Sequence, residues 1–303
     1  MTNKELLGAL DEVSQRNLTF VICHLSFSNP RTMIHSTAVI DPRVQLGPDV
    51  EIGPNVVLEG PVSIGAGTKV QANAVIVGQV KIGSGNTIGY GSVIGGFPQD
   101  LSYRPDSPSG VEIGNDNVLR EYCTIHRGTK PDTLTVLGNQ CLLMVGAHLG
   151  HNARVGNQVI LANNVLLGGY VEVHDKAFLG GASVVHQYTR LGTMSIMQGG
   201  SAVSKDVPPF GTEAGRNSIV GINVVALRRA GFGSELRLEV KRAFHILYHE
   251  RLNTSQAAAK AAEEKWSPQV QPFWDFVKTS KRGICAFVRW SEVKGDSTSA
   301  EAE

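Results

Sequence analysis

The stretch VEIGPNVVLEGPVSIGAGTKV, residues 50–70, repeats one pattern with a period of six residues. Glycine follows the repeated aliphatic residue at Gly53 and Gly65. In most repeats, the residue two positions before the repeated aliphatic residue is itself small or aliphatic. Neither a helical period nor simple strand alternation produces this spacing. It is typical of a parallel β-helix, in which three six-residue sides close one triangular coil. Outward from this stretch, the repeated positions are Ile34, Ile40, Leu46, Ile52, Leu58, Ile64, Val70, Ile76, Ile82, Ile88 and Ile94.

The period is interrupted after Ile94 and then resumes, which predicts loops inserted into a continuous β-helix. It returns at Ile113, Leu119 and Ile125, lapses again, and becomes regular at Leu137, Leu143, Leu149, Val155, Leu161, Leu167, Val173, Leu179, Val185, Leu191, Met197 and Val203. We expect these side chains to stack inside the solenoid, with glycines where the bend needs positive φ or close backbone approach. At about 4.8 Å between coils, the repeats would form a prism roughly 45 Å long.

The rest of the chain differs in texture from the repeats. Residues 1–33 carry apolar residues at helical spacing but no signal-peptide pattern. They form a loosely attached arm, or else residues 1–32 are an extension from an upstream start codon, because Met33 directly precedes the first repeat. Helical spacing returns from Ser234, and the last residues are polar and acidic. The expected organisation is an N-terminal extension (1–33), a β-helix (34–210) with loop excursions near 96–111 and 127–135, a small C-terminal helical domain (211–290) and a disordered tail (291–303).

Composition excludes several classes of function. The net charge of +1 gives no field that would favour nucleic acid, and no run of eighteen apolar residues predicts a membrane span. The four cysteines, Cys23, Cys123, Cys141 and Cys285, show no zinc-binding spacing, so we expect reduced thiols in a cytosolic protein. We expect neither a cofactor nor a resident metal.

The segment GAHLGHN, residues 146–152, is the strongest candidate for a site. The period points Leu149 inward, which leaves His148 and His151 on outward or corner positions. A histidine held in one tautomer by a neighbour can act as a general base. Two solvated surface histidines would give the same sequence. A metal site, as in a γ-class carbonic anhydrase, would need a third ligand that the sequence does not offer.

Three other positions are weaker candidates from the residues alone. His126 lies in TIHRGT (124–129), and His186 precedes Gln187 at a later corner. Arg228 and Arg229 could bind phosphate through forked hydrogen bonds, or they could simply be solvated.

Taken together, these motifs resemble the UDP-N-acetylglucosamine O-acyltransferase family, which begins lipid A synthesis. The resemblance extends from about residue 33 to 290 and includes the helical tail. The shared strings are QDL (99–101), TIHRGT (124–129), AHLGH (147–151), ILANN (160–164), VHQ (185–187), DVPP (206–209), LRR (227–229) and GF (231–232).

This resemblance implies a left-handed β-helix and a homotrimer with its sites between neighbouring chains. It implies a cytoplasmic enzyme that moves a 3-hydroxyacyl chain from acyl carrier protein to the 3-hydroxyl of UDP-N-acetylglucosamine. His151 matches the general base, and the backbone N–H of Gly169 matches the donor that stabilises the oxyanion. Gly199 matches the position that measures the acyl chain. Matches to sugar, uridine and phosphate contacts are Asp100, His148, Gln187, Asn223 and Arg229.

Four residues depart from the family pattern. Asn152 stands where an aspartate usually orients the base, and its amide can accept the ring N–H without stabilising the imidazolium by charge. Ser102 replaces a lysine, Tyr170 a histidine and Val225 a glutamate. These departures leave two alternatives open: a related acyltransferase for another nucleotide sugar, such as a 3-amino analogue, or a weakly active paralogue that binds acyl carrier protein. The later N-acyl enzyme is unlike this chain, because it carries a large domain before its repeats.

Overall fold

The structure is a computed structural model that describes residues 32–295. The helical spacing in the N-terminal extension therefore lies outside the described residues, as does Cys23. Cys123, Cys141 and Cys285 are free thiols, all of them buried. Within the described range, no helix combines the length and the apolar character needed to cross a lipid bilayer.

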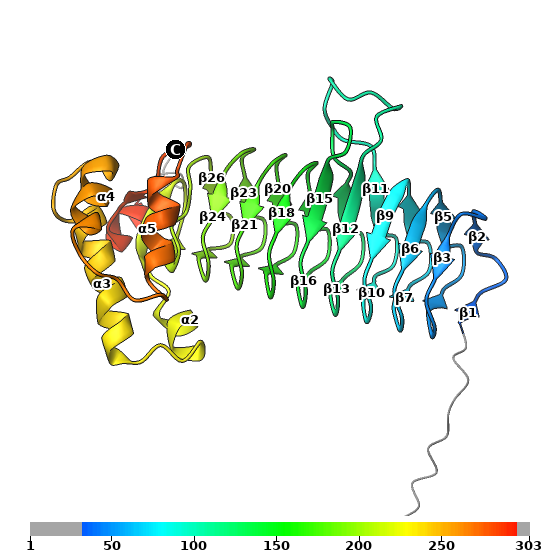
Figure 1. Cartoon of the computed structure of the whole chain (residues 1–303), viewed down its shortest axis with the longest axis horizontal. Coiled ribbons are helices and arrows are strands. Elements are labelled where there is room, and N and C mark those ends of the chain that lie inside the picture. Colours follow the sequence, from blue (N-terminus) through cyan, green and yellow to red (C-terminus); the bar gives the residue numbers. More distant parts are fainter. Residues whose placement is uncertain (1–31, 296–303) are drawn as a thin grey trace, which may run out of the picture. The chain divides into compact units, whose positions relative to one another are not determined.

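Three sheets form the walls of the predicted parallel β-helix (Figure 1). Within the coils each strand pairs in parallel with the strand three further along the chain, so neighbours in a sheet come from successive coils. Paired residues, such as Leu149 and Leu167, are separated along the chain by the length of three six-residue sides. The period read from the sequence is therefore confirmed as the geometry of the coil.

We call the three walls sheets A, B and C. The strands of sheet A are β1 (Met33–Ile34), β4 (Glu51–Ile52), β7 (Lys69–Val70), β10 (Thr87–Ile88), β13 (Val118–Leu119), β16 (Leu142–Leu143), β19 (Ile160–Leu161), β22 (Phe178–Leu179), β25 (Ile196–Met197), β27 (Gly211–Glu213), β28 (Ser218–Ile222) and β29 (Ala286–Phe287). The strands of sheet B are β2 (Val39–Ile40), β5 (Val57–Glu59), β8 (Val75–Val77), β11 (Val93–Gly96), β14 (Thr124–His126), β17 (His148–Leu149), β20 (Leu166–Leu167), β23 (Val184–Val185) and β26 (Ala202–Val203). The strands of sheet C are β3 (Gln45–Leu46), β6 (Val62–Ile64), β9 (Gln79–Ile82), β12 (Gly110–Ile113), β15 (Leu134–Leu137), β18 (Arg154–Val155), β21 (Glu172–Val173) and β24 (Arg190–Leu191).

The repeated aliphatic residues fill the interior, as the sequence predicted. From Ile52 to Val203 every one of them is buried. Ile34, in contrast, is 51% exposed, and Ile40 and Leu46 are half-buried. These three belong to the first coil, which has a neighbouring coil on one side only within the described residues. The core therefore begins one coil later than the period does.

Glycine after the repeated aliphatic residue is required by close approach of two coils. A Cβ placed on Gly65 would lie 2.6 Å from the carbonyl carbon of Gly83 in the next coil, a distance that real contacts do not reach. Many corners with positive φ carry other residues, for example Asn55 and Asn73. Of the two roles expected for these glycines, contact between backbones is the one that applies at Gly65.

Both loop excursions are enlarged corners between sheets B and C. One joins β11 to β12 through residues 97–109, and Figure 1 shows it standing out from the coils. The other joins β14 to β15 through residues 127–133. We call the turns from sheet B to sheet C the BC corners. Because successive coils align, all BC corners lie along one edge of the β-helix.

The helices follow the last coil. They are α2 (Val224–Arg229), α3 (Ser234–Tyr248), α4 (Thr254–Ala262), α5 (Gln271–Lys278) and α6 (Trp290–Gly295). The short helix α6 occupies the start of the tail for which the sequence predicted disorder, and Val293 packs against Gly215 there. Residues 296–303 lie outside the described range. The division into separate domains remains a prediction.

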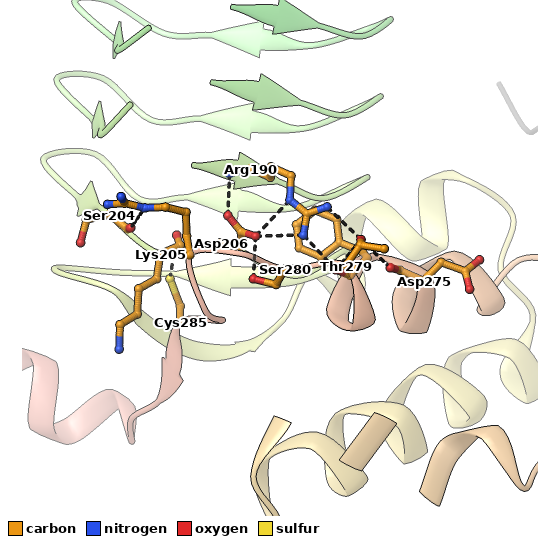
Figure 2. Close-up of polar contacts among 10 residues, drawn as sticks. Arg190, Ser204, Lys205, Asp206, Asp275, Thr279, Ser280 and Cys285 are labelled. Atoms are coloured by element: carbon orange, nitrogen blue, oxygen red, sulfur yellow. Dashed lines mark hydrogen bonds and ion pairs between the residues drawn. The ribbon is translucent and has the colours of Figure 1, made fainter. Parts of the chain in front are cut away.

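An ion pair joins the last coils to helix α5 (Figure 2). Arg190 Nε and Nη2 lie 3.0 and 2.9 Å from Asp206 Oδ2, and the Arg190 backbone N–H donates to Oδ1. The Ser280 hydroxyl also donates to Oδ2, at 2.8 Å. The guanidinium stacks 4.3 Å from the Phe276 ring centroid and donates to Thr279. We call this arrangement the Arg190–Asp206 joint.

Candidate active site

His151 lies at the BC corner between β17 and β18, with its side chain packed over Gly169 of the next coil. A Cβ on Gly169 would lie 2.4 Å from His151 Nε2, so any other residue would displace the imidazole. Among the described residues, none accepts a hydrogen bond from the Gly169 backbone N–H. The absence of a side chain at Gly169 therefore leaves room for the His151 imidazole, and the backbone N–H of Gly169 remains a free donor among the described residues.

The tautomer of His151 follows from its contact with Asn152. Thr129 donates its backbone N–H to Asn152 Oδ1 at 3.0 Å. Because an amide N–H can only donate, this contact establishes which atom of Asn152 is the oxygen. His151 Nδ1, which is 3.1 Å from the same oxygen, must therefore carry the hydrogen. The lone pair then belongs to Nε2, the atom that a general base needs.

Asp100 reaches the same place from the excursion of residues 97–109. Its Oδ2 lies 3.7 Å from His151 Nε2. Ser102 donates from its hydroxyl and its backbone N–H to Oδ1, at 2.7 and 2.8 Å. These two hydrogen bonds lower the pKa of Asp100, and the bond from the hydroxyl has the larger effect, so the carboxylate stays ionised. Ser102, which the sequence marked as a lost cation, thus orients the carboxylate.

His148 lies on β17 with its Nδ1 at 2.7 Å from Thr124 Oγ1. Its ring meets that of His126 edge to face, with centroids 4.8 Å apart. Burial lowers the pKa of His148 to about 4 and also lowers the pKa of His126. Both rings are therefore neutral at pH 7 and add no positive charge beside His151.

Gln187 and Gly199 lie in later coils. Gln187 is exposed at a BC corner, one coil after Gly169, so it belongs to the same edge. Gly199 is exposed at a corner between sheets A and B, across the width of sheet B from that edge. Its open surroundings include one close contact, since an added Cβ would lie 3.3 Å from the Gly181 carbonyl oxygen.

Asn223 and Arg229 line a separate cavity of about 600 Å³ on the outer face of sheet A, and the cavity shares no lining residue with the His151 cluster. Asn223 caps helix α2 by accepting from the Ala226 N–H, and its amide donates to Met194. Val225, which the sequence marked as a departure, lines the same cavity. Arg228 is exposed on α2 and does not line it.

The sequence reasoning missed Thr129 as a member of the cluster and missed the contacts of Tyr170. Tyr170 meets the His151 ring edge-on, with centroids 5.4 Å apart. Its hydroxyl lies 3.1 Å from Thr129 Oγ1. The length of one coil aligns Tyr170 with Asn152, and this signal was available in the sequence. Within residues 32–295, no three His, Cys, Asp or Glu side chains gather as a metal site would require.

Comparisons with known proteins identify relatives of this chain. A family model described as UDP N-acetylglucosamine O-acyltransferase, domain 2, matches residues 206–285, and a bacterial transferase hexapeptide model matches residues 61–96. A Sulfurihydrogenibium protein named acyl-(acyl-carrier-protein)–UDP-N-acetylglucosamine O-acyltransferase is 52% identical over 83% of this chain and 93% of its own length. A Thermodesulfovibrio yellowstonii protein of the same name is 40% identical over 83% of this chain and 98% of its own length.

Solved structures support the same conclusion. The UDP-N-acetylglucosamine acyltransferase of Bacteroides fragilis matches with a TM-score of 0.79 and 41% identity, over 83% of this chain and 99% of that one. The Arabidopsis enzyme matches with a TM-score of 0.74 and 31% identity, over 84% and 100%. The fold predicted from the sequence, a left-handed parallel β-helix of hexapeptide repeats, is confirmed. The chain belongs to the family of acyl-carrier-protein-dependent UDP-N-acetylglucosamine O-acyltransferases.

Proposed function

We propose that this chain transfers a 3-hydroxyacyl group from acyl carrier protein to the 3-hydroxyl of UDP-N-acetylglucosamine, the first step of lipid A synthesis. The names of its relatives supply the two substrates. The observation that carries the proposal for this chain is the position of His151, with Nε2 unprotonated, against Gly169, whose backbone N–H has no acceptor among the described residues.

The chemistry follows from these two groups. Nε2 removes the proton of the sugar hydroxyl as its oxygen attacks the thioester carbonyl, so a C–O bond forms and the carbonyl oxygen becomes negative. The Gly169 N–H donates to that oxyanion. When the intermediate collapses, the C–S bond breaks and the imidazolium returns its proton to the thiolate. Asp100 is placed to hold the sugar or to attract the imidazolium.

The separation of the two predicted groups of residues supports assembly between copies. His151, Asp100 and Gln187 lie along the BC corners, whereas Asn223 and Arg229 face the cavity on sheet A. The whole width of sheet C lies between those corners and sheet A, so the two groups face different sides of one chain. A closed homotrimer would bring the edge of one copy to the sheet A cavity of the next. Because the substrates are a nucleotide sugar and a carrier-borne thioester, we expect the trimer to act in the cytoplasm.

The outer face of sheet B is suited to the acyl chain. Leu166 and Val184 are both 44% exposed on this face, between the BC corners and Gly199. An acyl chain lying across them would be covered by the neighbouring copy. Gly199, without a side chain, would leave the far end of this path open.

The decisive experiment is acyl transfer by the purified chain with radiolabelled UDP-N-acetylglucosamine, its 3-amino analogue and a panel of 3-hydroxyacyl carrier proteins. We expect O-acylation of UDP-N-acetylglucosamine and a trimer by light scattering at micromolar concentration. Transfer to the amino sugar alone would move the chain to the related activity. Binding of carrier protein without transfer would make it a non-catalytic paralogue.

A further inference from the structure

Tyr170 continues a column of rings that begins at His151. It lies at the next BC corner, one full coil after Asn152, and it has the same left-handed backbone, with φ of 58° against 60°. Tyr188 follows one coil further on and stacks on it at 4.9 Å with an interplanar angle of 14°. The rings of His151, Tyr170 and Tyr188 thus follow one another over three coils. The period of the fold makes Tyr170 a direct neighbour of the catalytic corner.

The hydrogen bonds of Tyr170 have a fixed direction. Thr129 Oγ1 lies 3.0 Å from Asn152 Oδ1, an atom that can only accept, so Thr129 gives its single hydroxyl hydrogen to Asn152. The contact of 3.1 Å between Thr129 Oγ1 and the Tyr170 hydroxyl therefore has Tyr170 as the donor. The chain of donors runs from Tyr170 to Thr129 to Asn152. The same oxygen also accepts the N–H of His151 Nδ1.

We propose that Tyr170 is a positioning residue for His151, acting through Thr129 and Asn152 to hold the imidazole in the tautomer with Nε2 unprotonated. Its ring packs perpendicular to the imidazole and restricts rotation of that ring, and its hydroxyl keeps Thr129 donating toward Asn152. The inference rests on the proposed role of His151 as the base. In this arrangement, neutral hydrogen bonds replace the carboxylate that the family usually has at position 152, where this chain has Asn152.

The burial of the network supports a positioning role. Thr129 is 8% exposed and Asn152 7%, so their hydrogen bonds are largely shielded from solvent. The Asn152 backbone N–H is itself held by Thr135 Oγ1 at 2.7 Å. A hydroxyl that turned away from this oxygen would leave a buried polar group unpaired, which is costly. The network therefore has one favourable arrangement, and His151 is fixed by it.

The first test is Tyr170→Phe, measured as kcat and KM for both substrates. We expect a roughly 3- to 10-fold loss of kcat, the size expected for one hydrogen bond, with KM values unchanged. Tyr122→Phe is the matched control, because Tyr122 has the same φ of 58° and is 67% exposed. Its hydroxyl has no hydrogen bond within the described residues, so we expect wild-type rates. Equal rates for Tyr170→Phe and wild type would overturn the inference.

A double-mutant cycle with Thr129→Val tests the path. If Tyr170 acts through Thr129, the double variant should be no slower than the slower single variant. Multiplying losses would mean that the two residues act separately, and this would contradict the proposed chain of donors.

Rescue and nitrogen NMR separate positioning from a general structural defect. Asn152→Asp supplies a charged acceptor, so adding it to Tyr170→Phe should restore most of the rate and move the acidic limb of the kcat/KM–pH profile upward. The titratable groups that face His151 are Asp100, His126, His148 and Tyr170. The pKa of Asp100 is lowered by its hydrogen bonds with Ser102, and the pKa values of the two histidines are lowered by burial. The ¹⁵N shifts of His151 should report protonated Nδ1 in wild type and a tautomer mixture in Tyr170→Phe. An unchanged tautomer would refute the inference, and this readout works even if wild type transfers no acyl group.

Discussion

The BC corner at His151 and the Arg190–Asp206 joint are both buried polar networks, and they differ in what each leaves free. At the joint, both oxygens of Asp206 accept hydrogen bonds, and the Arg190 guanidinium donates from all three of its nitrogens. At the corner, neutral groups converge on one amide oxygen, and His151 Nε2 has no hydrogen-bond partner within residues 32–295, with Asp100 Oδ2 3.7 Å away. A satisfied network fixes one part of a fold to another. A network with one unsatisfied atom can take a proton.

The largest effect should come from removing that atom. We expect His151→Ala to lower kcat by about 10²- to 10⁴-fold, the usual contribution of a general base, with little change in melting temperature. Steady-state kinetics and thermal unfolding on the same preparation would check both parts. Near-normal turnover would place the base elsewhere and end the comparison.

Substitution at the Arg190–Asp206 joint should lower stability and leave catalytic activity unchanged. Asp206→Ala leaves the Arg190 charge without its partner, and breaking such a buried pair costs about 3–5 kcal/mol of unfolding free energy. Asp206→Asn, which keeps the shape, should cost less. We expect near-wild-type kcat for both variants well below their melting temperatures, measured alongside chemical denaturation. A folded Asp206→Ala enzyme without activity would show that the joint takes part in the site.

Glu213 sharpens the comparison because it is a buried carboxyl without the partners of Asp206. Within the described residues neither of its oxygens makes a hydrogen bond of normal geometry, and burial raises its pKa to about 8 although Ser201 lies close enough to oppose the shift. The folded state therefore keeps a proton that the unfolded state releases, so this group makes stability fall as pH rises from about 4.5 to about 8. Glu213→Gln should become more stable relative to wild type over that window. A stability difference that does not vary with pH would contradict this expectation.

The smallest effect is expected at Gly199, which belongs to neither network. Each additional buried CH₂ contributes roughly 0.8 kcal/mol, so an open path should favour acyl chains of about fourteen carbons. We expect Gly199→Met to move the preference toward about ten carbons while the KM for the sugar stays constant. Competition between 3-hydroxyacyl carrier proteins of different length measures this. A wild type that already prefers ten carbons would place the limit on chain length elsewhere.

The sequence could predict the coils because each side chain that fills them meets the same environment every six residues. Ile125, Leu149 and Leu167 occupy equivalent buried positions in successive coils of sheet B, so the period alone locates them. Ile34 escapes the rule because it stands at the end of the stack, where it is 51% exposed. Periodicity predicts the interior and not its boundary.

The site was harder to predict, because its partners come from corners that break the period. Thr129 lies in the excursion of residues 127–133, so its distance from Asn152 along the chain is not a multiple of the coil. Ser102 sits two residues after Asp100, a local turn contact that the sequence permits but does not require. Both departures from the family pattern at Ser102 and Tyr170 become understandable only when their hydrogen bonds are known.

The coil-to-coil register also determines how such a protein can change over generations. Gain or loss of a whole coil keeps every inward residue inward, whereas gain or loss of one residue within a coil shifts the pattern of all that follows. BC corners are the exception, since two of them hold extra residues while the strands on either side remain paired. New chemistry can therefore be acquired by lengthening a corner, without redesign of the walls. Asp100 and Thr129 both stand on insertions of this kind.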